Sequence, residues 1–249
     1  MRAWQRYFET MNGVVQRAYD TQGDNIMRAA QMLADATEKG GIIHLFGSGH
    51  SSLVTEDCFW RSATLANVHA IFESAVAGIN EITKTSLLEK VEGIGQVIVS
   101  YNEVRPPDVM MCFSNSGNNA ATVDVALAAQ AAGVPVIAFT NVEYADKLTT
   151  QHSSGKKLKD IADLVIDNCS LIGDAAIELE GLEVKVGATS TIPVVYLLAG
   201  LLAQTCELLL ERGVTPDVYY NGHLEYERTD VREHNQALVE KYRRRMRNL

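Results

Sequence analysis

The sequence predicts an α/β protein built around a doubly wound parallel sheet that helices cover on both faces. Short apolar segments, such as residues 42–46 and 108–113, alternate with longer segments whose apolar residues recur at helical spacing. The short segments are apolar throughout, which is typical of strands buried on both faces. A chain of 249 residues with 47% hydrophobic residues can form one such domain with appendages.

The chain begins with a predicted helical arm, residues 1–39. Apolar residues recur at helical spacing over residues 3–38, and Gly23 is expected to divide this segment into two helices. Gly40 and Gly41 end the second helix. The apolar stripe of the arm must be buried, either against its own domain or against a second copy of the chain.

The main domain is predicted over residues 40–211, followed by a C-terminal segment and helix over residues 212–249. Strands are expected at residues 42–46, 67–72, 108–113, 136–140 and 164–167. Helices are expected at residues 52–62, 86–103, 120–132, 190–211 and 232–246. The helix at 190–211 is so apolar that most of its surface should be buried.

Two turns rich in small polar residues, 47–52 (GSGHSS) and 114–119 (SNSGNN), each join a strand to a helix. Open parallel sheets bind ligands at the carboxyl ends of their strands, where the first N–H groups of the helices are free to bind an anion. We therefore predict a phosphate site. A third helix start, at Thr189 and Ser190, is a further candidate. The predicted binding residues are Gly47, Ser48, Gly49, Ser51, Ser52, Ser114, Asn115, Ser116, Gly117, Asn118, Asn119, Thr189 and Ser190.

Other interpretations of these turns remain open. Ser and Asn are also good helix caps and turn residues, although one cap needs only one of them. No lysine is present for a P-loop. The first turn supplies two glycines of a dinucleotide motif but has Ser52 at the third position; Glu73 lies near the spacing of the acidic residue in such folds. That motif would leave the second turn unexplained.

Composition narrows the classes of function. A net charge of −9 disfavours binding to nucleic acid or to an anionic membrane. No apolar run approaches the roughly 20 residues of a membrane span, and the first 15 residues carry charges where a signal peptide would be apolar. The cysteines form no CxxC pair, so we expect them to be reduced and buried, and the protein to be cytoplasmic. We expect no metal site and no required cofactor. The cysteines are Cys58, Cys112, Cys169 and Cys206.

These turns resemble the two phosphosugar-binding motifs of the SIS (sugar isomerase) domain family: GSGHS is similar to the first, and SNSGNN after DVMMCF to the second. The resemblance covers residues 40–211. Three further stretches, GDAAIELEGLEVKVGATST (173–191), HSSGKKL (152–158) and REHN (232–235), resemble the uncharacterised UPF0309 group, whose members are sometimes labelled as phosphoheptose isomerases.

The resemblance implies a flavodoxin-like sheet with an N-terminal helical arm, in a homodimer or homotetramer. It implies that Ser114 and Ser116 contact a phosphate, with Ser51 contributing from the first turn. Asn119 stands where SIS domains commonly have Ser or Thr. Phosphoheptose isomerases carry acidic residues where this chain has Trp60 and Arg61, and they carry Gln and His on the late helix, which this chain lacks at matching positions. The isomerase activity therefore does not transfer residue by residue.

Sugar-phosphate isomerisation needs a base that moves a proton between adjacent carbons. Glu56 is the first candidate, since it follows the first turn by about one helical turn; the alternative is a solvated glutamate. His50 lies inside that turn. Glu81 is expected in a loop at the same edge, and His234 in a late segment that could close over a site, including a neighbouring subunit's. Each of these three also has a purely structural alternative.

The sequence thus predicts a protein that binds a phosphorylated sugar or amino sugar and isomerises it. The alternatives are a phosphosugar etherase or lyase, and a non-enzymatic sensor or partner subunit. The basic end, residues 241–247, is interpreted as a solvated helix end rather than a nucleic-acid site.

Overall fold

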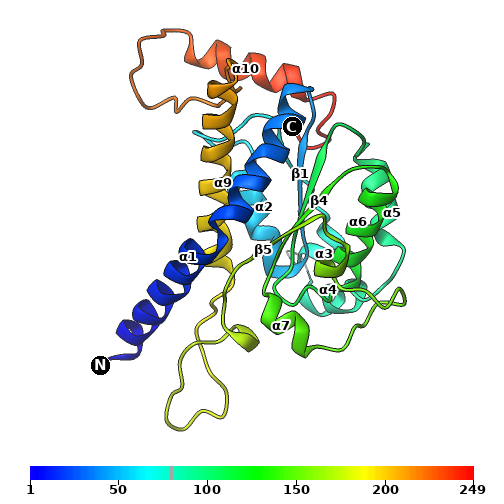
Figure 1. Ribbon diagram of the computed structural model, residues 1–249, viewed down its shortest axis with the longest axis vertical. Helices are drawn as coiled ribbons and strands as arrows, with labels where there is room; N and C mark the ends of the chain where they lie inside the picture. The colour runs from blue at the N-terminus through cyan, green and yellow to red at the C-terminus, as the bar shows by residue number, and fades with distance from the viewer. Residues whose placement is uncertain (79–80) are drawn as a thin grey trace.

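A five-stranded parallel sheet forms the centre of the computed structural model, which describes residues 1–78 and 81–249 (Figure 1). The strand order is β2-β1-β3-β4-β5, and every neighbouring pair is parallel. The predicted fold class is confirmed. The winding reverses between β1 and β3, which makes the gap beyond their carboxyl ends the ligand-binding position of such sheets. The strands are β1 (Ile43–Gly47), β2 (Val68–Ala70), β3 (Val109–Phe113), β4 (Val136–Thr140) and β5 (Leu164–Asp167).

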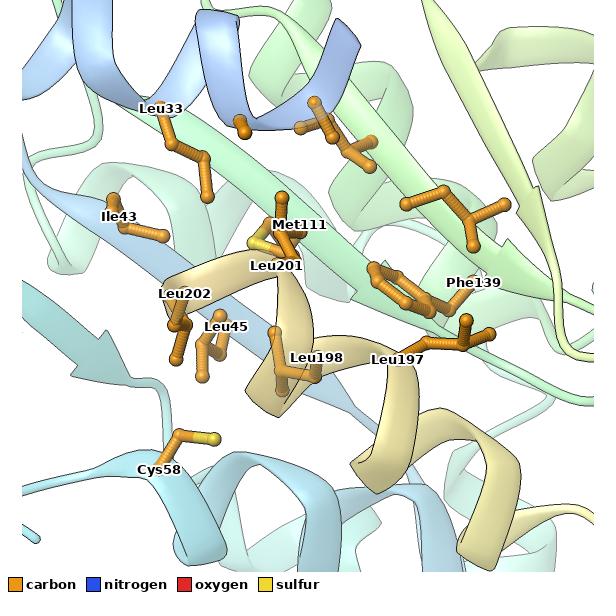
Figure 2. Close-up of a cluster of buried hydrophobic side chains, with 14 of the residues drawn as sticks. Leu33, Ile43, Leu45, Cys58, Met111, Phe139, Leu197, Leu198, Leu201 and Leu202 are labelled. Carbon is orange, nitrogen blue, oxygen red and sulfur yellow. The ribbon is translucent and has the colours of Figure 1, made fainter. Parts of the chain in front are cut away.

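Three helices cover one face of the sheet: α1 (Ala3–Glu38), α2 (Ser52–Cys58) and α9 (Thr191–Glu211). Figure 2 shows Leu33 of α1 and Leu201 of α9 facing Ile43 and Met111 of the strands. Because alternate strand residues point to opposite faces, Ile43 and Leu45 join this core and Phe46 joins the other. The arm is thus packed on its own domain.

The opposite face is covered by α5 (Ile94–Tyr101), α6 (Ala120–Ala131) and α8 (Leu158–Ile161). Alanines of α6, such as Ala121 and Ala129, are fully buried, so this helix lies close to β3 and β4. Shorter helices surround the carboxyl edge of the sheet: α3 (Ser74–Ala77), α4 (Ile82–Leu88) and α7 (Val142–Lys147). That edge carries the predicted site.

The arm is one helix of 36 residues, so the predicted break at Gly23 is wrong. A glycine inside a helix destabilises it by about 1 kcal/mol relative to alanine, which the long packing contact between α1 and α9 outweighs. Gln22, beside it, is buried and its side-chain oxygen accepts a hydrogen bond from the N–H of Asp167 at 3.0 Å. Tertiary packing therefore keeps the helix continuous through the glycine.

Two other predicted helices are shorter than expected. The helix after the first turn ends at Cys58 rather than near residue 62, because residues 63–66 turn to bond the backbone of residues 217–219. The predicted helix at 86–103 is divided into α4 and α5, with Gly93 in the left-handed region between them at φ 92°. Gly95 packs against Asp124, where a Cβ atom would come within 2.2 Å of the Asp124 backbone.

The helix α9 is long and apolar enough, by length and composition, to cross a membrane, contrary to the expectation from the sequence. In the structure it lies beside α1 on the sheet (Figure 1) and buries Leu198 and Leu201 in the core. Only 44% of its most apolar window is buried, so the expectation of burial over most of its surface is also wrong for this single chain. Ile192 and Tyr196 remain exposed.

The C-terminal segment forms α10 (Val231–Tyr242) and a tail that returns to the sheet. Tyr242 and Met246 pack with Ile42, which precedes β1, so this segment lies at the amino end of the strands, opposite the two turns (Figure 1). Lys241, Arg243, Arg244 and Arg247 of the basic end are exposed, as expected for a solvated end. Arg245 differs, because it forms an ion pair with the fully buried Asp108 at 2.8 Å. Free thiols are present at Cys58, Cys112 and Cys169, which are buried, and at Cys206, which is half-buried.

Candidate functional site

The two polar turns meet at the switch point of the sheet. They follow Gly47 of β1 and Phe113 of β3, which are partners in the sheet. The Oγ atom of Ser48 lies 3.4 Å from Oγ1 of Thr122, which belongs to the first helical turn after the second motif. The structure therefore brings both turns to one place.

The first turn requires glycine at its beginning. A Cβ atom on Gly47 would lie 2.5 Å from the carbonyl oxygen of Ser51, and Gly49 has a φ of 54°. Residues 49–51 form a 3₁₀ turn that leads into α2. Because α2 has only seven residues, its dipole adds little at this turn. The hydroxyl of Ser51 forms no hydrogen bond with the described residues, so it can donate to a ligand.

The second turn is closed by its own serines. Ser114 Oγ accepts a hydrogen bond from the N–H of Gly117 at 3.2 Å, and Ser116 Oγ accepts one from the N–H of Asn118 at 3.4 Å. Both serines act as acceptors here, and their hydroxyl protons remain available. Gly117 has a φ of 60°, and a Cβ atom there would lie 2.8 Å from Thr140 Oγ1.

The three asparagines of the second turn are engaged within the protein. Asn119 caps α6 by accepting from the N–H of Ala121. Asn118 donates to the carbonyl of Thr149 and accepts from the N–H of Gln151, which fastens the loop of residues 149–157 to the turn. The Asn115 amide oxygen accepts from Asn168 Nδ2 and Ser170 Oγ. These side chains shape the turn.

The third candidate terminus is already occupied by a carboxylate. Asp174 Oδ1 accepts from the backbone and hydroxyl of Thr189, and Asp174 Oδ2 accepts from the hydroxyl of Ser190 at 2.9 Å. A phosphate at the start of α9 would compete with this negative charge. In this arrangement both hydroxyl protons are directed at Asp174.

A small hollow separates the second turn from α9. Its volume is about 10 Å³, which is close to the space that one water molecule needs. Binding of a phosphate group there would require the surrounding elements to move apart. Its lining residues include Ser51, Ser114, Asn115, Asn168, Ser190 and Thr191.

A much larger hollow, of about 640 Å³, opens on the other side of the first turn. His50 and Glu56 line it, so the structure brings these two predicted catalytic residues together. Glu89, at the end of α4, lines the same hollow and was not predicted, because the sequence pattern placed a continuous helix there. The other lining residues are Gly49, Ser52, Leu53, Ala77, Gly78, Ile82, Thr85 and Ser86.

The remaining two predicted catalytic residues do not line this hollow. Glu81 is exposed at the start of α4 and is not one of the lining residues. His234 lies on α10, near the amino ends of the strands, where Nδ1 accepts from Arg228 and Nε2 donates to the carbonyl of Val218. Within one chain, His234 is a structural residue of the C-terminal segment.

A buried histidine supports the loop that covers the second turn. His152 Nε2 lies 2.9 Å from Asp124 Oδ1, and its Nδ1 accepts from the N–H of Ser154. Asp124 also accepts a hydrogen bond from the N–H of Gly93, and the Glu92 carboxylate accepts one from the N–H of Ser153. This network ties α5, α6 and the loop together behind the turn. Among residues 1–78 and 81–249, no group of three or more His, Cys, Asp or Glu side chains could hold a metal ion.

The fold and the site define a class of protein: an open, doubly wound α/β protein with polar turns at its switch point. The family model of the SIS domain matches residues 6–141. The UPF0309 protein of Geobacillus kaustophilus is 34% identical over 97% of this chain and 94% of its own length. The UPF0309 protein of Caldanaerobacter subterraneus is 35% identical over 98% of each chain. This chain therefore belongs to the SIS domain family and, within it, to the UPF0309 proteins.

Solved structures show the same fold at low identity. The phosphoheptose isomerase of Francisella tularensis aligns with a TM-score of 0.51 at 15% identity, covering 82% of this chain and 98% of that chain. The phosphoheptose isomerase of Neisseria gonorrhoeae aligns with a TM-score of 0.50 at 16% identity, covering 82% and 95%. At this identity the likeness concerns the fold alone.

Proposed function

We propose that this protein binds a phosphorylated sugar or amino sugar at the switch point and isomerises it by proton transfer. The observation that carries the proposal is the meeting of the two turns, with free hydroxyl protons on Ser51, Ser114 and Ser116. Ser51 of the first turn and Ser114 of the second line one small hollow, and their hydroxyl groups could donate to an anion with several acceptor oxygens once that hollow widens. The SIS family, to which the chain belongs, supports a phosphosugar as that anion.

The reaction would occur in the larger hollow beside the first turn. A base there must take a proton from the carbon next to a carbonyl and return it to the neighbouring carbon. Glu56 and His50 are the candidate base and proton donor, since both line the hollow. No cofactor is needed for this transfer.

A second candidate is a non-enzymatic phosphosugar sensor or partner subunit. The observation in its favour is that only two of the four predicted catalytic residues line one hollow, while His234 is bonded at the other end of the chain. A lack of turnover with every tightly bound sugar phosphate would favour it. A phosphosugar etherase or lyase would use the same initial proton removal.

The proposal includes a homodimer or homotetramer in the cytoplasm. Trp4 and Phe8 of α1 are 59% and 57% exposed, and Ile192 and Tyr196 of α9 are also exposed. A second copy could cover these apolar side chains. Light scattering on the purified protein tests this, and a monomer at micromolar concentration would contradict it.

Thermal unfolding against a panel of sugar phosphates tests the proposed ligand, with inorganic phosphate and unphosphorylated sugars as controls. A ligand at about 100 times its dissociation constant should add roughly 2.7 kcal/mol to the free energy of unfolding. The substitution Ser116→Asp should abolish the shift, because it places a negative charge where the phosphate binds. If no sugar phosphate shifts the unfolding temperature, the proposal is wrong.

A further inference from the structure

We propose that the hollow between α2, α3 and α4 holds the amine of a phosphorylated amino sugar, and that the protein prefers a free amine to its hydroxyl or N-acetyl counterpart. This inference rests on the proposed function, since it assumes that the phosphate is bound at the two turns. The amine is the chemical group by which the protein would select one sugar phosphate over another.

The hollow lies within reach of the turns. Gly49 and His50 of the first turn line the hollow, while Ser51 of the same turn lines the small hollow by the second. Because His50 and Ser51 are consecutive residues, the two spaces lie on either side of the same backbone turn. The N–H of Ala121, in the first turn of α6, also donates to the carbonyl of Glu89 at 3.1 Å. The rim of the hollow therefore touches the helix that begins at the second turn.

The hollow carries two carboxylates, and its described lining residues include His50 but no lysine or arginine. Glu56 comes from α2 and Glu89 from the end of α4, so carboxylates lie on two different walls. Neither forms an ion pair within 4 Å in the described part of the chain. Glu56 is exposed and Glu89 is half-buried. Two carboxylates without a cationic partner disfavour a second anion and favour a cation.

Two buried hydroxyls also face this space. Ser52 is 3% exposed and Thr85 is 6% exposed, and both line the hollow. Each has a carbonyl acceptor only at 3.5 Å, the outer limit of a hydrogen bond. A buried hydroxyl held so weakly is available to a ligand, and hydroxyl and carboxylate oxygens together can accept the protons of an ammonium group.

The shape of the hollow agrees with a sugar rather than with a bare cation. Its volume of about 640 Å³ exceeds the space of a single ion and lies in the range of small-molecule sites. Ala77, Leu53 and Ile82 supply apolar walls that can contact the C–H face of a sugar ring. Gly78, between α3 and α4, has a φ of 74°, a backbone conformation that favours glycine.

Calorimetric titration with matched sugar phosphates tests the preference. The probes are glucosamine 6-phosphate, glucose 6-phosphate and N-acetylglucosamine 6-phosphate, and the corresponding galactose and mannose sets. In at least one set, we expect the free amine to bind at least about tenfold more tightly than both counterparts. The same preference should weaken at high salt, because it is electrostatic.

The variant Glu89→Gln tests the origin of the preference, with Glu211→Gln as a control, since Glu211 is an exposed carboxylate at the far end of α9. Glu89→Gln should reduce the ratio between amine and hydroxyl sugars to less than about threefold, and the control should keep the ratio. Equal binding of the three members of every set, or tighter binding of an N-acetyl sugar, would overturn the inference while leaving the proposed function in place. Failure of every sugar phosphate to bind would overturn the proposed function itself.

Discussion

The polar side chains of the two turns divide into those that the protein holds and those that remain free. Asn115 and Asn118 have partners in the loops that follow β4 and β5, whereas Ser51 and Ser116 keep their hydroxyl protons. The free hydroxyls are the candidates for phosphate contact. The held amides keep the turn in the shape that presents them, so replacing them should change stability as well as binding.

Glu56 is the residue whose replacement separates an enzyme from a sensor. The variant Glu56→Gln keeps the size of the side chain but removes the base, so turnover of the preferred sugar phosphate should fall by at least about a hundredfold. Binding of a sugar phosphate that has no amine, measured by the shift in unfolding temperature, should persist. Undiminished turnover would exclude Glu56 as the base.

A buried pair of histidines predicts how stability depends on pH. His44 Nε2 lies 3.1 Å from Asp108, and its Nδ1 lies 3.0 Å from Nδ1 of His69. If His44 donates to Asp108, it accepts from His69, whose Nε2 then has no partner in the described residues. Burial and the neighbouring His44 lower the pKa of His69 to about 3, and burial lowers the pKa of His44 despite Asp108.

A histidine with a lowered pKa in the folded state binds its proton more readily when unfolded. Stability should therefore fall as the pH drops below the unfolded pKa of about 6.5, and His69 alone should account for about 2 kcal/mol between pH 7.5 and pH 5. Urea unfolding across this range should show a smaller loss for His69→Gln than for the parent. His223→Gln, at an exposed position, is the control and should behave as the parent. An equal loss in all three proteins would contradict the prediction.

Among the helices, α1 and α5 each contain a glycine, but the two glycines have different surroundings. Gly23 lies exposed in α1, and a Cβ atom added there would meet no other atom within 4 Å, whereas Gly95 in α5 touches the backbone of Asp124. Gly23 has no packing role in α1, whereas Gly95 allows α5 and α6 to pack close to each other. Sequence periodicity does not separate the two cases.

The substitution Gly23→Ala should raise the free energy of unfolding by about 0.5–1 kcal/mol, because alanine loses less backbone entropy in a helix. Gly95→Ala should lower it by at least about 1–3 kcal/mol, because its Cβ would lie 2.2 Å from Asp124. Chemical denaturation of both variants provides the measurement. Destabilisation by Gly23→Ala would show that α1 needs flexibility there.

For the whole molecule, the C-terminal tail closes the fold at the amino ends of the strands. Asp108 precedes β3 and is fully buried, and it accepts hydrogen bonds from Arg245 and from the N–H of Ile42. Burial raises the pKa of this carboxyl, but the hydrogen bonds from His44 and the backbone outweigh it and leave the pKa below its ordinary value. The carboxyl is therefore charged and needs its partner.

Replacing Arg245 by Met should lower the free energy of unfolding by about 3 kcal/mol or more, because it leaves a buried carboxylate without its cation. Arg61→Met is the matched control: Arg61 and Asp57 form an exposed pair, whose loss should change stability by less than about 1 kcal/mol. Equal effects of the two substitutions would show that the tail contributes little to the closed fold.

The sequence by itself determined the parallel sheet, the order of its strands along the chain and the two turns, because buried strands and the polar turns after them leave local patterns of apolar and small residues. Only the tertiary structure decided which polar groups of those turns stay free, since that depends on partners such as Asn168 and Asp174, far away in the chain. It also decided the uninterrupted α1, the early end of α2, and the joining of Glu56 with Glu89 in one hollow. These outcomes depend on contacts between distant segments, and packing free energy there outweighs the local preferences that a sequence displays.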